Sequence, residues 1–123
     1  LVLSRGAALD SPTPAPTAAP GSTTLNYDQA VNGNLRTGAR DSYTFTGRTG
    51  DLITIDMEAT FDTYLRVENS AGFEVASNDD RGDGTFNSRI ARFRLTADGI
   101  YTIRAGSYNN AGSGDYTLTL TGN

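Results

Sequence analysis

The side chains best suited to chemistry in this sequence gather in one acidic loop, SNDDRGDG, at residues 77–84. Asn78, Asp79 and Asp80 stand together there, and a further Asp follows. Carboxylate and amide oxygens presented by a loop are ligands that calcium takes in proteins. The spacing is not that of an EF-hand, because Ile90 stands where the bidentate glutamate belongs. The loop indicates either a calcium site or a turn whose Asn and Asp side chains bond to their own backbone.

The residue types most often used in catalysis are missing. The sequence contains no His, Cys or Lys, so it lacks the commonest general base, a thiol nucleophile and a Schiff-base amine. Zinc ligation by Cys or His is excluded for the same reason. Asp56 and Glu58 fall on one face of a predicted strand and invite comparison with a glycosidase pair, but carboxylates on a wet face usually serve solvation. We therefore expect no enzymatic activity.

The net charge of −4 and the pI of about 4.6 limit the partners of this chain. Nucleic acids are bound by basic surfaces, so we expect no nucleic-acid partner. The sequence also lacks an apolar run of about 18 residues, and we expect no membrane insertion.

All ten basic residues are arginines. Those on outward faces of predicted strands are Arg66, Arg92, Arg94 and Arg104. Cross-strand ion pairs with Glu58, Glu68 or Asp56 are their expected role, and an anion site is the alternative. Tyr108, in the loop GSYNNAGSG, either contacts a ligand or packs on the base of its loop.

From about residue 25 the sequence alternates between apolar and polar residues in short runs separated by Gly, Asn and Asp. The runs are SYTFTG, ITIDM, YLRVE, ARFRL, YTIRA and YTLTL. Alternation of this length predicts half-buried strands. The expected inward side chains are Tyr43, Phe45, Ile53, Ile55, Met57, Leu65, Val67, Ala91, Phe93, Leu95, Tyr101, Ile103, Ala105, Tyr116, Leu118 and Leu120. No helical periodicity appears, so we predict an all-β, antiparallel two-sheet sandwich of about eight or nine strands.

Residues 1–24 differ in composition from the rest and are predicted to form an extended tail and linker, with the sandwich domain at residues 25–123. All four prolines lie in this segment, at Pro12, Pro14, Pro16 and Pro20. Proline restricts its own φ and the conformation of its predecessor, so a semi-rigid extended linker is expected.

The first three residues, Leu1, Val2 and Leu3, are apolar and have no local core to enter. An extended apolar segment can add as a strand to the sheet edge of another molecule. We therefore hypothesise that residues 1–10 dock on a neighbouring copy, which makes the protein a homo-oligomer or polymer. The alternative is that the tail folds back on its own sandwich.

The order of five segments resembles a known family. The segments are DSYTFTGRTGDLITIDM, FDTYLRVENSAGFEVASNDD, NSRIARFRL, ADGIYTIRAGSY and GDYTLTL. Together they resemble the bacterial pre-peptidase C-terminal (PPC) domain over about residues 25–121, and they are similar to the collagen-binding modules of clostridial collagenases. The resemblance implies a secreted, jelly-roll-like β-sandwich without catalysis of its own, appended to an extracellular protease or another surface protein.

The resemblance also bears on calcium, which some members of the family bind. It places Asp62 of the FDTY segment near the acidic loop, and so implies Asp62, Asn78, Asp79 and Asp80 as calcium ligands. The collagen-binding relatives draw further acidic ligands from the segment before the sandwich, where this chain has only Asp10. Beyond this optional Ca²⁺, no cofactor is expected.

Two functions remain open. The first is a non-catalytic structural subunit that assembles through its tail into a filament or surface polymer. The alternative is an accessory or targeting domain of a secreted protease, which binds a polymeric extracellular substrate or calcium. Both place the protein outside a bacterial cell or at its surface. Polymers of the purified chain in micrographs would favour the first, and monomers the second.

Overall fold

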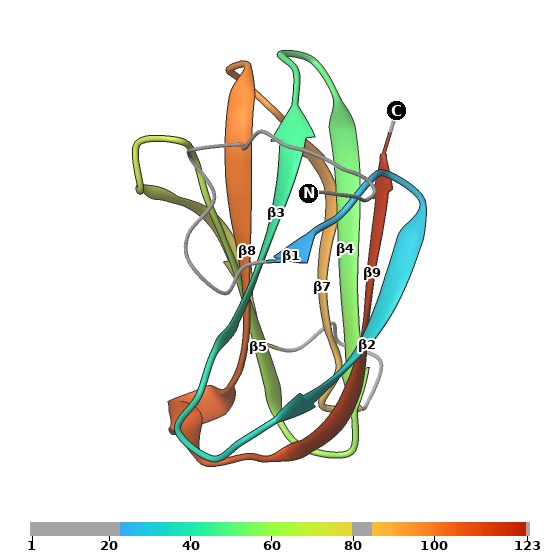
Figure 1. The fold of residues 1–123 in the computed structure, drawn as a ribbon, viewed down its shortest axis with the longest axis vertical. Helices are drawn as coiled ribbons and strands as arrows, with labels where there is room; N and C mark the ends of the chain where they lie inside the picture. The colour runs from blue at the N-terminus through green and yellow to red at the C-terminus, as the bar shows by residue number, and fades with distance from the viewer. Residues whose placement is uncertain (1–22, 80–84, 123) are drawn as a thin grey trace, which may run out of the picture.

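The computed structural model describes residues 23–79 and 85–122. Within these ranges nine β-strands form two sheets packed face to face (Figure 1). The strands are β1 Thr23–Thr24, β2 Gln29–Leu35, β3 Asp41–Gly47, β4 Leu52–Ala59, β5 Thr63–Glu68, β6 Glu74–Asn78, β7 Ser88–Arg94, β8 Gly99–Ser107 and β9 Gly114–Gly122, with a 3₁₀ helix η1 at Tyr108–Asn110. The predicted two-sheet β-sandwich is confirmed. No helix within this part of the chain has the length and apolar character needed to cross a membrane.

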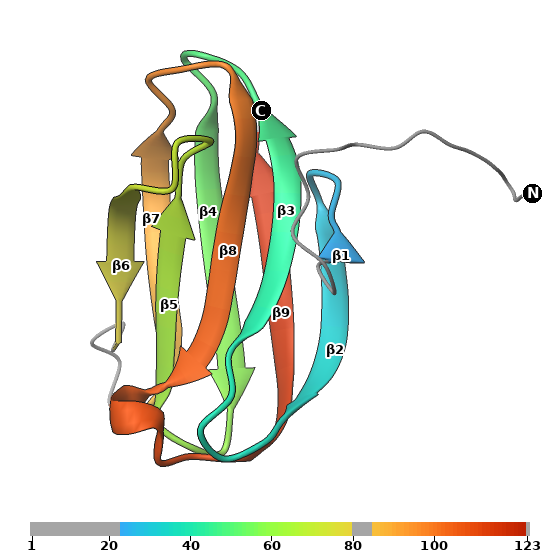
Figure 2. The ribbon, with the colours of Figure 1, turned by 60° about the vertical axis from the view of Figure 1, so that its left-hand side comes forward.

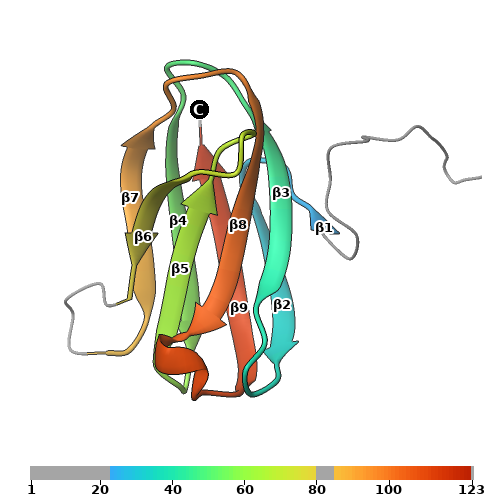
Figure 3. The ribbon, with the colours of Figure 1, turned by 90° about the vertical axis from the view of Figure 1, so that its left-hand side faces the viewer.

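The five-stranded sheet has the order β1-β3-β8-β5-β6, and the four-stranded sheet has the order β2-β9-β4-β7. Figure 3 shows the larger sheet in front of the smaller one. Only the connection from β5 to β6 stays within one sheet, and every other connection between successive strands crosses to the opposite sheet. This crossing pattern is the jelly-roll-like arrangement that the resemblance implied.

One strand pair departs from the antiparallel prediction. β1 runs parallel to β3 at the edge of the larger sheet (Figure 2). Leu25 follows β1, is only 1% exposed, and donates its N–H to the carbonyl oxygen of Thr44 at 2.7 Å. The chain thus lies alongside β3 just long enough to bury Leu25, and then crosses to begin β2 in the other sheet.

The core lies between the sheets and contains most of the expected inward side chains. Those with exposures of 0–1% are Leu25, Leu35, Phe45, Ile53, Ile55, Met57, Leu65, Val67, Leu95, Ile103, Ala105, Leu118 and Leu120. Leu25 and Leu35 were not among the predicted core residues. Burial of such apolar surface contributes about 25 cal/mol per Å² and is the main stabilising term of the sandwich.

The prediction that Ala91 faces the core is wrong. Between β4 and β7 the register shifts, so that Ile53 pairs with Phe93 while Ile55 pairs with Ile90. The extra residue on β7 is a β-bulge, and Arg92 within it has a left-handed φ of 51°. The bulge shifts the inward and outward alternation by one residue, so Ile90 is buried and Ala91 is exposed.

Polar side chains also link the two sheets. The hydroxyl groups of Tyr43 on β3 and Tyr116 on β9 are hydrogen-bonded at 2.5 Å, and the Tyr116 hydroxyl donates to Asp41 Oδ2 at 2.5 Å. Burial and the hydrogen bond to Asp41 raise the pKa of the Tyr116 hydroxyl. Thr63 on β5 and Ser88 on β7 make a second buried link, with 2.6 Å between their hydroxyl oxygens. These bonds satisfy polar groups that are expensive to bury alone.

Candidate ligand-binding site

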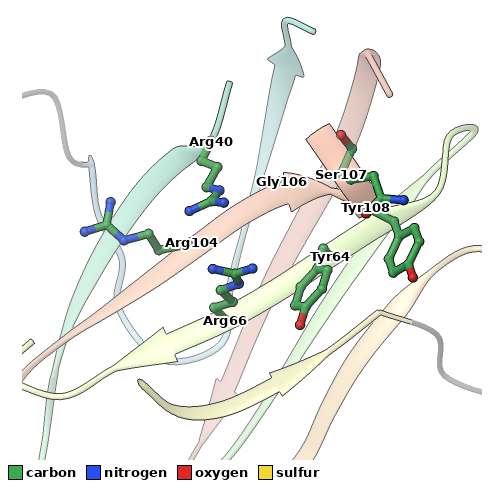
Figure 4. Close-up of a pocket in the computed structure, with 8 residues that line it drawn as sticks. Arg40, Tyr64, Arg66, Arg104, Gly106, Ser107 and Tyr108 are labelled. Atoms are coloured by element: carbon green, nitrogen blue, oxygen red, sulfur yellow. The ribbon is translucent and has the colours of Figure 1, made fainter. Parts of the chain in front are cut away.

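A hollow opens on the outer face of the five-stranded sheet, where β8 leads into η1 (Figure 4). Its volume is about 180 Å³. The lining residues are Arg40, Tyr64, Arg66, Arg104, Gly106, Ser107, Tyr108 and Asn109. We call it the arginine–tyrosine hollow.

The register of β5 and β8 brings the central residues of the hollow together. Arg66 lies opposite Arg104, and Tyr64 lies opposite Gly106. Because side chains two residues apart share a face of a strand, Tyr64 and Arg66 both point outward. Gly106 leaves room for the side chain of Arg40 from the loop before β3, since a Cβ atom at Gly106 would lie 3.2 Å from Arg40 Cγ.

Arg104 is held by a bidentate ion pair. Its Nε and Nη2 donate to Oε2 and Oε1 of Glu68, both at 3.2 Å, and its Nη1 donates to the Ser42 hydroxyl at 3.1 Å. The predicted pairing of an outward arginine with Glu68 is therefore confirmed for Arg104. With three nitrogens engaged, this side chain has a fixed orientation.

The other two arginines of the hollow are less constrained. The Arg66 guanidinium lies 4.7 Å from the centre of the Tyr64 ring, and its Nε is 3.7 Å from Glu74 Oε1. Arg40 is exposed and makes no hydrogen bond or ion pair with any residue of the described ranges. Figure 4 shows the Arg40 and Arg66 guanidinium groups over the same stretch of β8, whereas that of Arg104 points away from the tyrosines. Among the residues that the structure describes, no acidic side chain lines the hollow.

The two tyrosines form an aromatic wall. Their rings are stacked, with centroids 6.4 Å apart and an interplanar angle of 9°. The Tyr108 N–H donates to the carbonyl oxygen of Asp62 at 2.9 Å, which anchors the start of η1. Tyr108 is still 44% exposed. It therefore packs on Tyr64 and also presents a ring face to solvent.

The predicted calcium ligands are only partly described. The backbone carbonyl of Asp62 accepts the Tyr108 N–H, and Asn78 Oδ1 accepts the Arg89 N–H at 3.1 Å. Asp80 lies outside the described residues, and so do residues 81–84. Within the described ranges no three acidic residues lie close enough to hold a metal ion. The calcium site stays a prediction.

Of the other residues that the sequence singled out, the structure settles the role of Asp56 and does not describe the predicted subunit interface. Asp56 Oδ1 accepts a hydrogen bond from Arg89 Nε at 2.5 Å, so this carboxylate belongs to a cross-strand ion pair. Arg89 is thus the partner of Asp56, an assignment that the sequence analysis missed. Leu1, Val2 and Leu3, the predicted subunit interface, lie outside the described residues.

The sequence pointed to only part of the hollow. Arg66, Arg104 and Tyr108 were candidates because of their positions on strand faces and in a loop. Arg40 and Gly106 were missed, since neither belongs to a motif and their contact depends on how the loop before β3 crosses β8. Tyr64 could have been inferred from the sequence, because it lies two residues before Arg66 and therefore shares its outward face.

Comparison with known proteins places this geometry in context. Residues 39–107 match the family described as the bacterial pre-peptidase C-terminal domain. A probable subtilase-type serine protease of Deinococcus radiodurans is 32% identical over 75 residues, which are 56% of this chain and 10% of that protein. The chain therefore spans about a tenth of the length of this relative.

Solved structures agree on the fold. The pre-peptidase C-terminal domain of a collagenase from Bacillus anthracis has a TM-score of 0.67 at 20% identity, covering 81% of this chain and 94% of that one. A periplasmic inhibitor of g-type lysozyme from Aeromonas hydrophila has a TM-score of 0.63 at 14% identity, covering 83% of this chain and 96% of that one. A related inhibitor from Salmonella Typhimurium has a TM-score of 0.60 at 16% identity, covering 83% and 98%. Identities this low establish a shared sandwich fold and nothing about ligands.

Proposed function

Because this chain belongs to the bacterial pre-peptidase C-terminal domain family, we propose that it is an accessory domain of a secreted protease and binds the polymer that the protease cleaves. The observation that carries the proposal is the match to one short segment of a much longer probable serine protease. A segment of this size within a large enzyme is the expected form of an appended module.

The chemistry of the chain supports binding over catalysis. The sequence has no His or Cys to activate or supply a nucleophile. The arginine–tyrosine hollow instead offers guanidinium donors beside an aromatic wall, which is a composition typical of binding surfaces. Secretion follows from the same proposal, because the proteases that carry such domains act outside the cell.

Self-assembly has less support than the accessory role. The hypothesis depends on Leu1, Val2 and Leu3, which lie outside the described residues. A homo-oligomer or polymer formed through residues 1–10 stays a prediction, and size-exclusion chromatography of the purified chain tests it.

Co-sedimentation with insoluble polymers tests the accessory role. The purified chain is mixed with fibrous collagen, elastin or keratin, and with cellulose and chitin as non-protein controls, in the presence of excess serum albumin. We expect the chain to sediment with at least one protein polymer, to stay in solution with both polysaccharides, and to release no peptides from casein. Failure to sediment with every protein polymer, or proteolysis by the chain alone, would contradict the proposal.

A further inference from the structure

The arginine–tyrosine hollow has one more arginine than the carboxylates that pair with its arginines within the described residues. Three guanidinium groups line it, from Arg40, Arg66 and Arg104, and two carboxylates pair with them, from Glu68 and Glu74. Three positive charges against two negative charges leave one in excess, on a chain whose net charge is −4. The excess is therefore local, and it favours an anionic ligand at this place.

The unpaired donors can be assigned to particular side chains. Arg104 uses three of its nitrogens on Glu68 and Ser42 and has little left to offer. Arg66 touches Glu74 only through Nε at 3.7 Å, beyond hydrogen-bond distance, so its guanidinium edge stays available. Arg40 has no partner within the described ranges. Figure 4 shows the Arg40 and Arg66 guanidinium groups facing a common space above β8.

We propose that the arginine–tyrosine hollow binds the side-chain carboxylates of an acidic peptide segment, an inference that rests on the proposed binding of a protein polymer. A carboxylate between Arg40 and Arg66 would accept charge-assisted hydrogen bonds from two planar guanidinium groups, and such bonds are stronger than those between neutral groups. Neighbouring apolar groups of the peptide would pack on the exposed face of Tyr108, which is braced by Tyr64.

A sparsely charged peptide fits this site better than a sulfated polysaccharide. Densely charged polymers are held by many cations in a row, and their affinity grows with the number of charges neutralised. Here one positive charge is in excess, and the negative net charge of the chain repels a polyanion. The hollow of about 180 Å³ also matches one or two side chains more closely than a sugar chain.

Calorimetric titration of the full chain with two matched peptides tests the ligand class. The probes are the capped pentapeptide Ala-Glu-Leu-Glu-Ala and its counterpart with Gln in place of Glu. We expect the Glu peptide to bind about tenfold more tightly, since loss of one charge-assisted hydrogen bond corresponds to roughly that factor. We also expect its affinity to fall as sodium chloride is raised. Equal affinities would overturn the proposal.

Matched variants test the location. Arg40→Gln is expected to weaken binding of the Glu peptide about fivefold, Arg40→Lys less, and Arg40→Glu to abolish it. Arg94→Gln on β7 of the opposite sheet makes the same change in net charge and should leave affinity unaltered. Because the Arg40 side chain is exposed and unpaired within the described ranges, its variants should melt at the wild-type temperature. Amide shifts at Tyr64, Gly106 and Tyr108 on titration would support the assignment.

The outcomes separate this inference from the proposed function. Peptide binding that depends on Arg40, without sedimentation on any protein polymer, would support the hollow and contradict the accessory role. Sedimentation that Arg40→Glu leaves intact would support the accessory role and overturn the hollow. An equal loss of peptide affinity in Arg94→Gln and Arg40→Gln would overturn it too, because net charge would then explain the binding. Binding of a heparin hexasaccharide but not of the Glu peptide would overturn the peptide assignment.

Discussion

The Tyr116 hydroxyl is buried between two polar groups, the Tyr43 hydroxyl and the Asp41 carboxylate. Tyr116→Phe removes both hydrogen bonds and leaves the Tyr43 hydroxyl without its cross-sheet partner. We expect the free energy of unfolding to fall by about 1–3 kcal/mol, the range for leaving a buried polar group unsatisfied. Urea unfolding monitored by circular dichroism measures the change.

The same residues offer an internal check. In the double variant with Tyr43→Phe, the second substitution removes a hydroxyl that has already lost its partner. The double variant should therefore lose less stability than the sum of the losses in the two single variants. Tyr108→Phe, on an exposed ring, serves as the control and should leave stability unchanged. Strict additivity of the two losses would mean that the hydroxyls do not interact.

Asp98 stabilises a turn through its ionised form. Its Oδ1 accepts the Thr49 N–H at 2.8 Å and the Thr49 hydroxyl at 3.1 Å, and these bonds lower the pKa of Asp98 from its ordinary value of 3.8. A folded state with the lower pKa binds fewer protons than the unfolded state, so this stability is present above pH 3.8 and is lost as pH falls through the lowered pKa.

We therefore expect Asp98→Asn to flatten the acid side of the stability profile. Urea midpoints between about pH 5 and pH 2 should fall less steeply in Asp98→Asn than in the wild type, because the amide does not titrate. Asp28→Asn, which makes the same change at an exposed carboxylate away from this turn, is the matched control. Parallel profiles for wild type and Asp98→Asn would show that the bonds to Thr49 contribute nothing in solution.

At the level of strands, sequence pattern predicted the elements that alternate cleanly and missed those that do not. β4, β5, β8 and β9 have regular apolar alternation and were found with the correct faces. β2 was missed because its inward positions include Gln29 and Gly33, which carry no apolar signal. The face of β7 was predicted only in part, because a bulge at Arg92 depends on pairing with β4 and leaves no local signature.

Packing explains why β2, the strand that the sequence analysis missed, has a glycine at the inward position 33. Gly33 pairs directly with Tyr116, and a Cβ atom at this position would overlap the Tyr116 ring. That ring is 3% exposed and is held by its hydroxyl bonds, so it has little room to move. Gly33→Ala is expected to lower the free energy of unfolding by about 1–3 kcal/mol through overpacking. Ala30→Ser, at an exposed position of the same strand, is the control, and equal urea midpoints for both variants would contradict this steric explanation.

At the scale of the whole molecule, the sandwich is closed by contacts between distant parts of the chain. β2, near the start of the described residues, pairs along its whole length with β9, the final strand. Because nearly every connection crosses from one sheet to the other, most strands pair with strands that are distant in the sequence. Forming such distant pairings first costs the entropy of closing long loops. Folds with this topology therefore fold slowly, in milliseconds to seconds.

The positions of the prolines determine whether refolding should contain a slow phase. All four lie at residues 12–20, before the first described strand, and the sequence from residue 21 to the end contains none. Isomerisation of X-Pro bonds, which takes roughly 10–100 s, should therefore not limit formation of the sandwich. In a double-jump experiment, refolding after a brief or a prolonged stay in denaturant should show the same single rate at millisecond to second times. A slow phase that grows with time in denaturant and is accelerated by a prolyl isomerase would show instead that the proline-rich segment takes part in folding of the domain.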